Sequence, residues 1–480
     1  MARTGAQYLE GLKDDREVWL GAERVGDVTS HPALQGAAGS VADLYDLQHE
    51  AADVCLVTNP DDGEPMNASH IVPRCAADLQ KRHASVERIA QTSLGILGRS
   101  PDYLNVTFAG FAGLAHIWAA NGNDRGAANL VAFQKEVAAR DLCLTHAIIH
   151  ATVDKKLGDL ASGGGEIALH KVEATANGIL VRGARVLATL APFSDEMAVY
   201  PSHTFPNSDP RYALAFSIPM DTAGLKLICR DSFSLPSSAF DHPFSSRFDE
   251  QDAFVVFDDV EVPRDRIFVD GDHDICANVM NIGWAANVMQ QTSLRAAVKL
   301  EFAYQLAVKM VEALNAGNPQ TYEMLGEIWS YAELTRSAVK SAEEGAYDWG
   351  NGTWLCDERP FRALRPMLPK WFARVNEIIK LLGAHNLLTT PTAAQLAEPS
   401  LRPFIDKYLQ GAAGTSAEER SRIFRTAWDF VGTALGSRVE LYERFYLASA
   451  PRTFQIAHHV AQKQPGRSRL VDELLARKSE

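Results

Sequence analysis

A cation and a phenol occur four residues apart in the segment GRSPDY, residues 98–103. We expect the glycine to end one helix, and the Ser-Pro-Asp run suits the cap and first turn of the next. Arg99 and Tyr103 then meet at a helix start, where a guanidinium, a phenol hydroxyl and free backbone N–H groups can face one anionic oxygen. An ordinary capped helix with a solvated Arg99 is the alternative, and the local pattern by itself favours it.

His146 is the third candidate, inside the apolar run Leu142–Ile149. Strand alternation places its side chain on one face with Leu144 and Ile148. An imidazole can exchange a proton near neutral pH, which suits general acid–base chemistry. A single histidine in an apolar run is more often a hydrogen-bonded core residue, so the pattern leaves both interpretations open.

Composition limits the class of protein. The chain has 480 residues, 46% hydrophobic and 22% charged, which is typical of a globular enzyme. Its length predicts two or three domains, or one domain with a large helical extension. Its formal net charge of −13 disfavours nucleic acid as a partner. No secretory signal and no run long enough for a transmembrane helix is expected, so we predict no membrane association. Six scattered cysteines without a CxxC pair suggest reduced, mostly buried thiols in a cytoplasmic protein.

Several common catalytic motifs are absent from the sequence. It contains no phosphate-binding glycine motif, no nucleophile elbow and no His/Cys cluster with metal-ligand spacing. We therefore expect no metal site and no built-in nicotinamide domain.

The spacing of apolar residues changes twice and predicts an α+β protein of three domains. Residues 1–141 read as helical, with helices over 74–97 and 124–140. Residues 142–272 carry short β-prone runs between turn residues, typical of a small antiparallel barrel or sandwich. Residues 273–480 indicate a bundle of long amphipathic helices. The helices predicted there span 275–313, 321–349, 363–388 and 418–435.

A hairpin is the clearest local signal in the β-region. Asn177-Gly178 separates the strand-like runs 170–174 and 179–186. Asn and Gly tolerate the positive φ of a type I′ turn, so we predict a hairpin at this point. Further strands are expected at 196–200, 211–218, 225–229 and 253–262.

Short segments spread over the whole chain carry a family resemblance. They are RTGAQYLEGL (3–12), GRSPDYLN (98–105), LTHAIIHATVDKK (144–156), RVLATLAPFSDE (185–196), PFSSRFDEQDAFVVFDDVEVP (243–263), LRAAVKLEF (294–302), GAHNLL (383–388) and GSRVELYE (436–443). In this order they resemble the 4-hydroxyphenylacetate 3-monooxygenase large-component family. Each segment alone is weak, and their conjunction is specific.

The resemblance implies an acyl-CoA-dehydrogenase-like fold, with an N-terminal helical domain, a central antiparallel β-barrel and a C-terminal helical bundle, assembled as a homotetramer. It implies the oxygenase component of a two-component monooxygenase that uses FADH2 and O2. The substrate would be a phenol, such as 4-hydroxyphenylacetate or a tyrosine-derived phenol, hydroxylated at the ortho carbon. A separate NAD(P)H:flavin reductase delivers the FADH2 in such systems, which fits the missing nicotinamide domain.

Matched to the family's positions, Arg99, Tyr103 and His146 hold the phenolic oxygen of the substrate. Arg99 favours the phenolate, Tyr103 hydrogen-bonds it, and His146 receives or shares its proton. A phenolate carries charge to its ortho carbon, which then attacks an electrophilic oxygen held on flavin C4a. A pocket closed to water protects that oxygen.

The same match assigns flavin contacts to His146, Thr152, Lys155, Thr189, Arg444 and Tyr446. Family members carry Gln and Arg where this chain has Thr152 and Lys155. Lys155 can pair with a phosphate, but with less geometric definition than an arginine. Arg444 and Tyr446 fall where the family closes over the flavin.

Other interpretations differ in the residues they require. A halophenol or nitrophenol monooxygenase of this family carries a histidine near 288–291, where this chain reads Val-Met-Gln-Gln. A 4-hydroxybutyryl-CoA dehydratase needs cysteine ligands for an iron–sulfur cluster, and Arg99 and Tyr103 stand in that segment instead. An acyl-CoA dehydrogenase needs a catalytic glutamate. Neither that enzyme nor a non-catalytic scaffold explains the trio of Arg99, Tyr103 and His146.

The family marker SSRFDE, residues 245–250, is predicted to be a structural turn. We expect Arg247 to pair there with Asp249 or Glu250.

Overall fold

The computed structural model describes residues 2–158, 160, 162–200, 209–463 and 469–476. No helix within these ranges is long and apolar enough to span a membrane. All six cysteines are free and only Cys75 is exposed, which confirms the prediction of mostly buried thiols.

The N-terminal part is mainly helical. Its helices are α1 (Gly5–Gly11), α2 (Gln35–Glu50), α3 (Ala52–Cys55), α4 (Ala76–Thr92), α5 (Pro101–Gly113), α6 (Ala115–Trp118) and α7 (Asp124–Arg140). The bounds predicted for α7 are confirmed. The helix predicted over 74–97 ends earlier, at Thr92, and Gly95 turns the chain with φ +69° against the backbone of a later helix. Gly98 therefore does not end this helix.

Short strands within the first 141 residues correct the all-helical prediction. They are β1 (Glu17–Leu20), β2 (Glu23–Val25), β3 (Leu56–Thr58) and β4 (Pro65–Asn67). β1 pairs with a strand more than two hundred residues later in the sequence. Strands of three or four residues are too short for an alternation pattern, and only pairing across the fold defines them.

The β-region forms two sheets among the described residues, rather than one closed barrel. Its strands are β5 (Leu144–His146), β6 (His170–Ala174), β7 (Gly178–Thr189), β8 (Glu196–Val199), β9 (Leu214–Pro219), β10 (Leu225–Cys229), β11 (Asp252–Pro263) and β12 (Ile267–Asp270). The sheet orders are β2-β1-β10-β11-β7-β6 and β12-β9-β8-β5. The pairs β1–β10 and β5–β8 are parallel, so the prediction of a purely antiparallel region is wrong. Phe216 and Phe257 join the two sheets, with ring centres 6.1 Å apart.

The predicted hairpin is confirmed, but its turn is not of type I′. β6 and β7 pair in antiparallel fashion, and neither Asn177 nor Gly178 has a positive φ. The backbone N–H groups of both residues instead donate to the Thr175 hydroxyl, at 3.2 and 2.9 Å. Glycine is needed at position 178 because a Cβ there would collide with the carbonyl of Val262.

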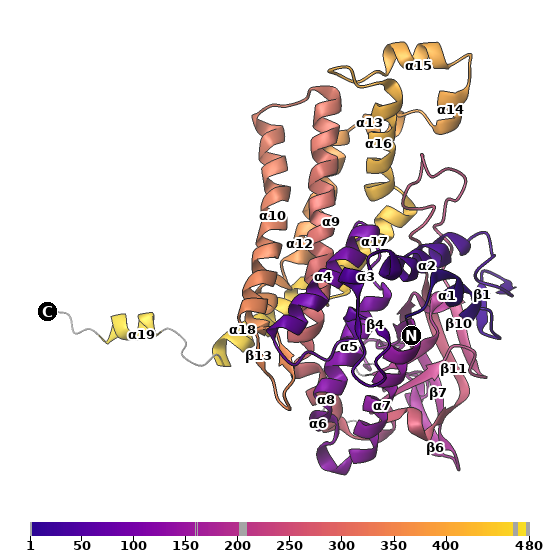
Figure 1. The fold of residues 1–480 in the computed structure, drawn as a ribbon, viewed down its shortest axis with the longest axis vertical. Helices are drawn as coiled ribbons and strands as arrows, with labels where there is room; N and C mark the ends of the chain where they lie inside the picture. Colours follow the sequence, from indigo (N-terminus) through magenta and orange to yellow (C-terminus); the bar gives the residue numbers. More distant parts are fainter. Residues whose placement is uncertain (1, 159, 161, 201–208, 464–468, 477–480) are drawn as a thin grey trace.

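The C-terminal part contains the longest helices, and α9 and α10 run side by side in Figure 1. Its helices are α8 (His273–Asn281), α9 (Trp284–Leu314), α10 (Pro319–Glu344), α11 (Glu358–Leu364), α12 (Leu368–Gly383), α13 (Asn386–Thr389), α14 (Ala393–Ala397), α15 (Arg402–Tyr408), α16 (Ala417–Val431), α17 (Ala434–Phe445), α18 (Ala450–Lys463) and α19 (Leu470–Leu475). A two-stranded ribbon, β13 (Tyr347–Asp348) and β14 (Trp354–Leu355), follows α10. The single helix predicted over 275–313 is two helices, because Gly283 takes φ +75° between α8 and α9.

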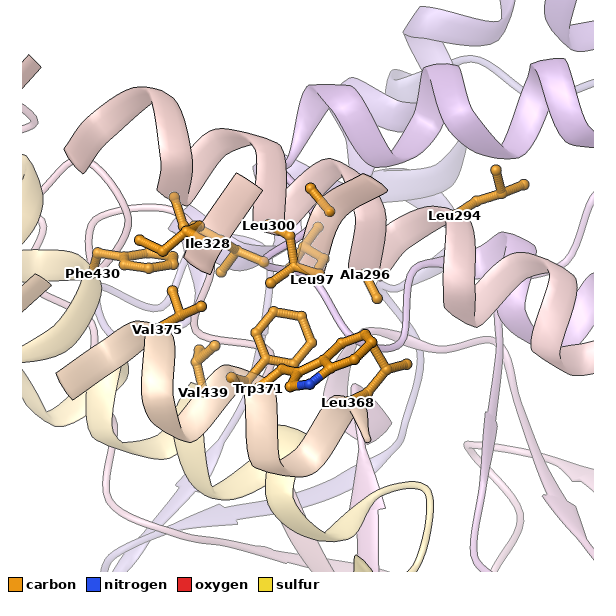
Figure 2. Close-up of a cluster of buried hydrophobic side chains, with 14 of the residues drawn as sticks. Leu97, Leu294, Ala296, Leu300, Ile328, Leu368, Trp371, Val375, Phe430 and Val439 are labelled. Carbon is orange, nitrogen blue, oxygen red and sulfur yellow. The ribbon is translucent and has the colours of Figure 1, made fainter. Parts of the chain in front are cut away.

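A buried apolar cluster holds the bundle together (Figure 2). Leu300 from α9, Ile328 from α10, Val375 from α12, Phe430 from α16 and Val439 from α17 all belong to it. Each side chain of this size contributes roughly 1.5–3 kcal/mol when it is removed from water. The cluster fixes α17 against α9, and these two helices supply one wall of the site described next.

Candidate active site

Arg99 and Tyr103 lie at the start of α5, as the Ser-Pro-Asp run predicts. Ser100 occupies the N-cap position, although its side chain caps no backbone N–H. The guanidinium carbon of Arg99 lies 4.1 Å from the centre of the Tyr103 ring. Arg99 is 8% exposed and Tyr103 3% exposed, so the alternative of a solvated arginine is wrong.

His146 ends β5 and faces the same site. Its ring lies 5.7 Å from the Tyr103 ring in an edge-on arrangement, and its Nδ1 lies 2.5 Å from the hydroxyl of Tyr200. Burial, and then the charge of Arg99, hold the pKa of His146 well below its usual range. The imidazole is therefore neutral beside a guanidinium at physiological pH.

Two tyrosines near the C-terminus close over Arg99. Tyr442 on α17 and Tyr446 just beyond it stack with ring centres 4.5 Å apart. Nη1 of Arg99 donates to the Tyr442 hydroxyl at 2.5 Å, and that hydroxyl donates to the carbonyl of Gly98 at 3.0 Å. A Cβ at position 98 would collide with the Tyr442 ring, so Gly98 is required for this close approach.

The charge of Arg99 is maintained in spite of its burial. Burial acts to lower the pKa of the guanidinium, but Tyr442, Tyr103 and the other surrounding tyrosines outweigh it, and the pKa lies above the ordinary value. A permanent cation in a nearly dry interior attracts an anion more strongly than the same cation in water.

A buried ion cluster supports the tyrosine pair. Glu443 accepts from Nη1 and Nη2 of Arg295, at 2.7 and 3.0 Å, and from Nζ of Lys299 at 3.0 Å. Nη2 of Arg295 also donates to the Tyr446 hydroxyl at 3.0 Å. Burial opposes the charge of Glu443, but the two cations lower its pKa to about 2. Burial lowers the pKa of Lys299 to about 8.

A second series of polar contacts joins Arg99 to Thr189. The backbone N–H of Arg99 donates to one oxygen of Glu250 at 2.6 Å, and Arg438 donates to the other at 2.6 Å. Arg438 also pairs with Asp252 at 2.6 Å, and the Thr189 hydroxyl donates to Asp252 at 2.7 Å. One arginine thus connects the phenol-binding candidates with a flavin-binding candidate.

The pairing predicted for Arg247 is wrong. Arg247 pairs at the surface with Asp43 at 3.2 Å, whereas Asp249 pairs with Arg230 at 2.5 Å. Glu250 belongs to the site, because it bonds to Arg99 and Arg438. The neighbouring acids of the segment 245–250 point in different directions, which the linear sequence does not reveal.

Polar groups without a partner among the described residues occur on Gln251, which stands between Glu250 and Asp252 in the sequence, and on Arg99. Gln251 is completely buried with φ +49°, and neither polar atom of its amide has a hydrogen-bond partner within the described ranges. Nε of Arg99 is likewise unpartnered among the described residues. The ring N–H and carbonyl groups of an isoalloxazine would satisfy such atoms. The donor and acceptor types of these residues therefore suit a flavin.

The remaining flavin-binding candidates are more exposed than Arg99, Tyr103 and His146. Thr152 is half-buried and Lys155 is exposed, both in the segment after β5. Arg444 is exposed and pairs with Glu440 on the same helix at 3.0 Å. The structure thus brings Arg99, Tyr103, His146 and Tyr446 together, and links Thr189 to them through hydrogen bonds.

Tyr200 and Tyr442 are the functional candidates that sequence reasoning missed. The spacing of Tyr442 and Tyr446, four residues apart in a predicted helical region, was a readable signal for an aromatic pair on one helix face. Tyr200 has no such signal, because its partner His146 lies on a different strand.

Comparison with known proteins gives matches over nearly the whole chain. Family models described as 4-hydroxyphenylacetate 3-hydroxylase, N terminal and C terminal, match residues 4–269 and 277–476. The 4-hydroxyphenylacetate 3-monooxygenase oxygenase component of Thermus thermophilus is 36% identical over 476 residues, which cover 98% of this chain and 97% of the relative.

Two solved structures extend the comparison. The oxygenase component HpaB of 4-hydroxyphenylacetate 3-monooxygenase, complexed with FAD and 4-hydroxyphenylacetate, is similar with a TM-score of 0.93 and 34% identity, covering 99% of this chain and 98% of that one. A 4-hydroxybutyryl-CoA dehydratase from N. maritimus has a TM-score of 0.88 at 18% identity, covering 100% and 96%, which is a likeness of fold alone.

Proposed function

This chain belongs to the 4-hydroxyphenylacetate 3-hydroxylase family, and from that premise we propose that it is the oxygenase component of a two-component flavin-dependent monooxygenase. It uses FADH2 and O2 to hydroxylate a phenol, such as 4-hydroxyphenylacetate or a tyrosine-derived phenol, at the carbon next to the hydroxyl. The observation that carries the proposal is the meeting of Arg99, Tyr103 and His146 at one buried site.

The chemistry of the trio follows from charge and burial. Arg99 remains a cation, and an adjacent cation in a low-dielectric interior favours the phenolate over the neutral phenol. The Tyr103 hydroxyl and His146 hydrogen-bond the same oxygen and so fix the ring orientation. A phenolate is more electron-rich at its ortho carbon than a phenol is. Bound reduced FAD, with O2, supplies the electrophilic oxygen.

Water exclusion is the second requirement, and the tyrosine pair supports it. Tyr442 and Tyr446 cover Arg99 from the side of α17, and the Arg295–Glu443 ion pair holds them there. A closed pocket protects a reactive oxygen from loss to solvent.

The proposed flavin contacts are His146, Thr152, Lys155, Thr189, Arg444 and Tyr446. Thr189 is the best supported of them, because its hydroxyl donates to Asp252, which Arg438 links to Glu250 and so to Arg99. Lys155 and Arg444 are exposed, so they suit the phosphate part of FAD rather than its ring.

We extend the proposal to partners and assembly. A separate NAD(P)H:flavin reductase supplies the FADH2, and the oxygenase works as a cytoplasmic homotetramer. Its proposed domains are residues 1–141, 142–272, with a barrel-like β-core, and 273–480.

The alternatives are less well supported by the residues. The segment 288–291, where a halophenol or nitrophenol enzyme carries a histidine, is buried in α9, and Gln291 donates there to Asp102 at 2.9 Å. A dehydratase of the iron–sulfur type would need thiolates at the site, where Arg99 and Tyr103 stand. An acyl-CoA dehydrogenase or a non-catalytic scaffold gives no reason for a buried cation beside two phenols.

The test is anaerobic loading of the protein with FADH2, followed by oxygenated buffer with 4-hydroxyphenylacetate or a related phenol. A catechol product heavier by one oxygen atom, formed without excess peroxide, would support the proposal. Release of all the oxygen as peroxide with every phenol offered, together with turnover of an acyl-CoA, would contradict it.

A further inference from the structure

The proposed chemistry leaves Tyr200, the closest partner of His146, without a role. Tyr200 follows β8 two residues after Ala198, which pairs with His146 in the β5–β8 register, and alternation returns its side chain to the same face. Its hydroxyl lies 2.5 Å from Nδ1 of His146. Edge-on contacts hold the Tyr200 ring, with centres 6.4 Å from Phe108 and 5.4 Å from Phe111. One imidazole nitrogen is thereby engaged, and Nε2 is the one available to a ligand.

Both members of this pair are uncharged at physiological pH. Burial, and then Tyr103, raise the pKa of Tyr200 well above its usual range. Burial, and then the charge of Arg99, lower the pKa of His146. Two arrangements remain: the Tyr200 hydroxyl donates to Nδ1, or Nδ1–H donates to the Tyr200 oxygen.

Hydrogen-bond satisfaction selects the first arrangement. A phenol hydroxyl is the stronger donor, and an imidazole nitrogen is the stronger acceptor. Within the described part of the chain, Nδ1 is the only acceptor near the Tyr200 hydroxyl, so the second arrangement would leave a buried O–H unsatisfied. The ring proton of His146 therefore resides on Nε2.

We propose that Tyr200 is a positioning residue that holds His146 in the Nε2–H tautomer, so that His146 donates a hydrogen bond to the phenolate oxygen. This inference rests on the proposed function. Tyr103 faces His146 from α5, Arg99 from the segment just before α5, and Tyr200 from the position just after β8. A guanidinium, a phenol O–H and an imidazole N–H then surround one oxygen as donors.

The consequence concerns the proton of the substrate. Three donors select the anion, so the phenol releases its proton to water as it binds. His146 does not receive that proton, because its remaining nitrogen already carries one. This assigns the trio to anion binding rather than to base catalysis.

The probe is 4-nitrophenol, because its phenolate is coloured and its neutral form is not. The full-length protein with bound FAD is titrated with the probe across a range of pH, and the absorbance gives the pKa of the bound probe. Tyr200→Phe keeps the ring and removes the hydroxyl, which frees Nδ1 to take the ring proton. The wild-type protein should lower the pKa of the bound probe, and Tyr200→Phe should hold about tenfold less phenolate at a given pH.

The matched control is Tyr212→Phe, which removes a buried hydroxyl that donates to the carbonyl of Gly165 at 2.5 Å, away from His146. Its bound probe should titrate as in the wild-type protein. A Tyr200→Phe variant that melts normally and ionises the probe as well as the wild-type protein would overturn the inference. A wild-type protein that binds only the neutral probe would overturn the proposed function itself.

A second pair of variants decides the matter if Tyr200→Phe does not fold. In His146→Gln an amide N–H stands near the position of Nε2 and can donate but not accept a proton. In His146→Leu the donor is lost. The glutamine variant should hold more phenolate than the leucine variant at the same pH, and equal amounts would overturn the inference.

Discussion

Replacing Glu443 by glutamine should destabilise the protein by several kcal/mol, although the change is nearly isosteric. Glu443 is 1% exposed and is the anion that Arg295 and Lys299 share at 2.7 and 3.0 Å. In Glu443→Gln both cations stay in the interior without a carboxylate. Breaking a buried pair by removal of one partner typically costs about 3–5 kcal/mol.

The pKa of Glu443 gives a second measure of the same effect. Its fall from 4.5 to about 2 corresponds to roughly 3 kcal/mol, because a tenfold change in proton affinity is worth about 1.4 kcal/mol. Lys299, whose pKa is already about 8, can lose its proton in the variant and relieve part of the cost. We therefore expect a loss of about 3 kcal/mol at neutral pH, the lower end of the range for buried pairs.

Denaturant unfolding of both proteins at several pH values is the assay. Glu443 contributes its full stabilisation above pH 4.5, and this contribution is lost as the pH falls through about 2, where the carboxylate becomes protonated. The difference in unfolding free energy between the two proteins should therefore shrink over that interval. Glu440→Gln is the control, because Glu440 lies on the same helix and pairs with the exposed Arg444. Loss of that surface pair should lower the free energy of unfolding by less than about 1 kcal/mol. A loss of the same small size for Glu443→Gln, or a difference that does not depend on pH, would refute the reasoning.

Three further predictions address the site and the pH response. Arg99→Gln should lower kcat/KM for phenol hydroxylation by about 10²–10³-fold, because the cation that favours the phenolate is lost. Mass analysis of the product measures this rate, and an unchanged kcat/KM would exclude the proposed role of Arg99. Tyr442→Phe keeps the aromatic stack but removes the hydroxyl that accepts a hydrogen bond from Arg99. The free energy of unfolding should fall by about 1 kcal/mol, and an unchanged value would mean that this contact does not stabilise the fold. Burial lowers the pKa of His83, but hydrogen bonds to Glu343 and Glu87 outweigh this effect and raise the pKa to about 9. Protonated His83 therefore stabilises the fold fully below pH 6.5, and this stabilisation is lost as the pH rises through 9. Thermal unfolding should show His83→Gln destabilised at pH 6.5 and equal to the wild-type protein above pH 9, and a constant difference would contradict this.

Local patterns in the sequence predicted much of the secondary structure. The helix over 124–140 and the strand over 225–229 have the predicted bounds, because apolar periodicity and capping residues act within one element. The start of α5 at Pro101 follows from the same local chemistry. The resemblance to a family predicted that Arg99, Tyr103 and His146 act together, whereas periodicity alone left open whether His146 is a core residue or a catalytic one.

The tertiary structure decided what depends on partners distant in the chain. β1 became a strand because β10 lies beside it, and Arg247 pairs with Asp43 rather than with its neighbours in the sequence. The contacts of Tyr200 with His146 and of Tyr442 with Arg99 join segments that no local period connects. Burial has the same origin: only the packed fold removes water from Arg99 and His146, and this removal makes their charges and proton positions differ from those of the free side chains.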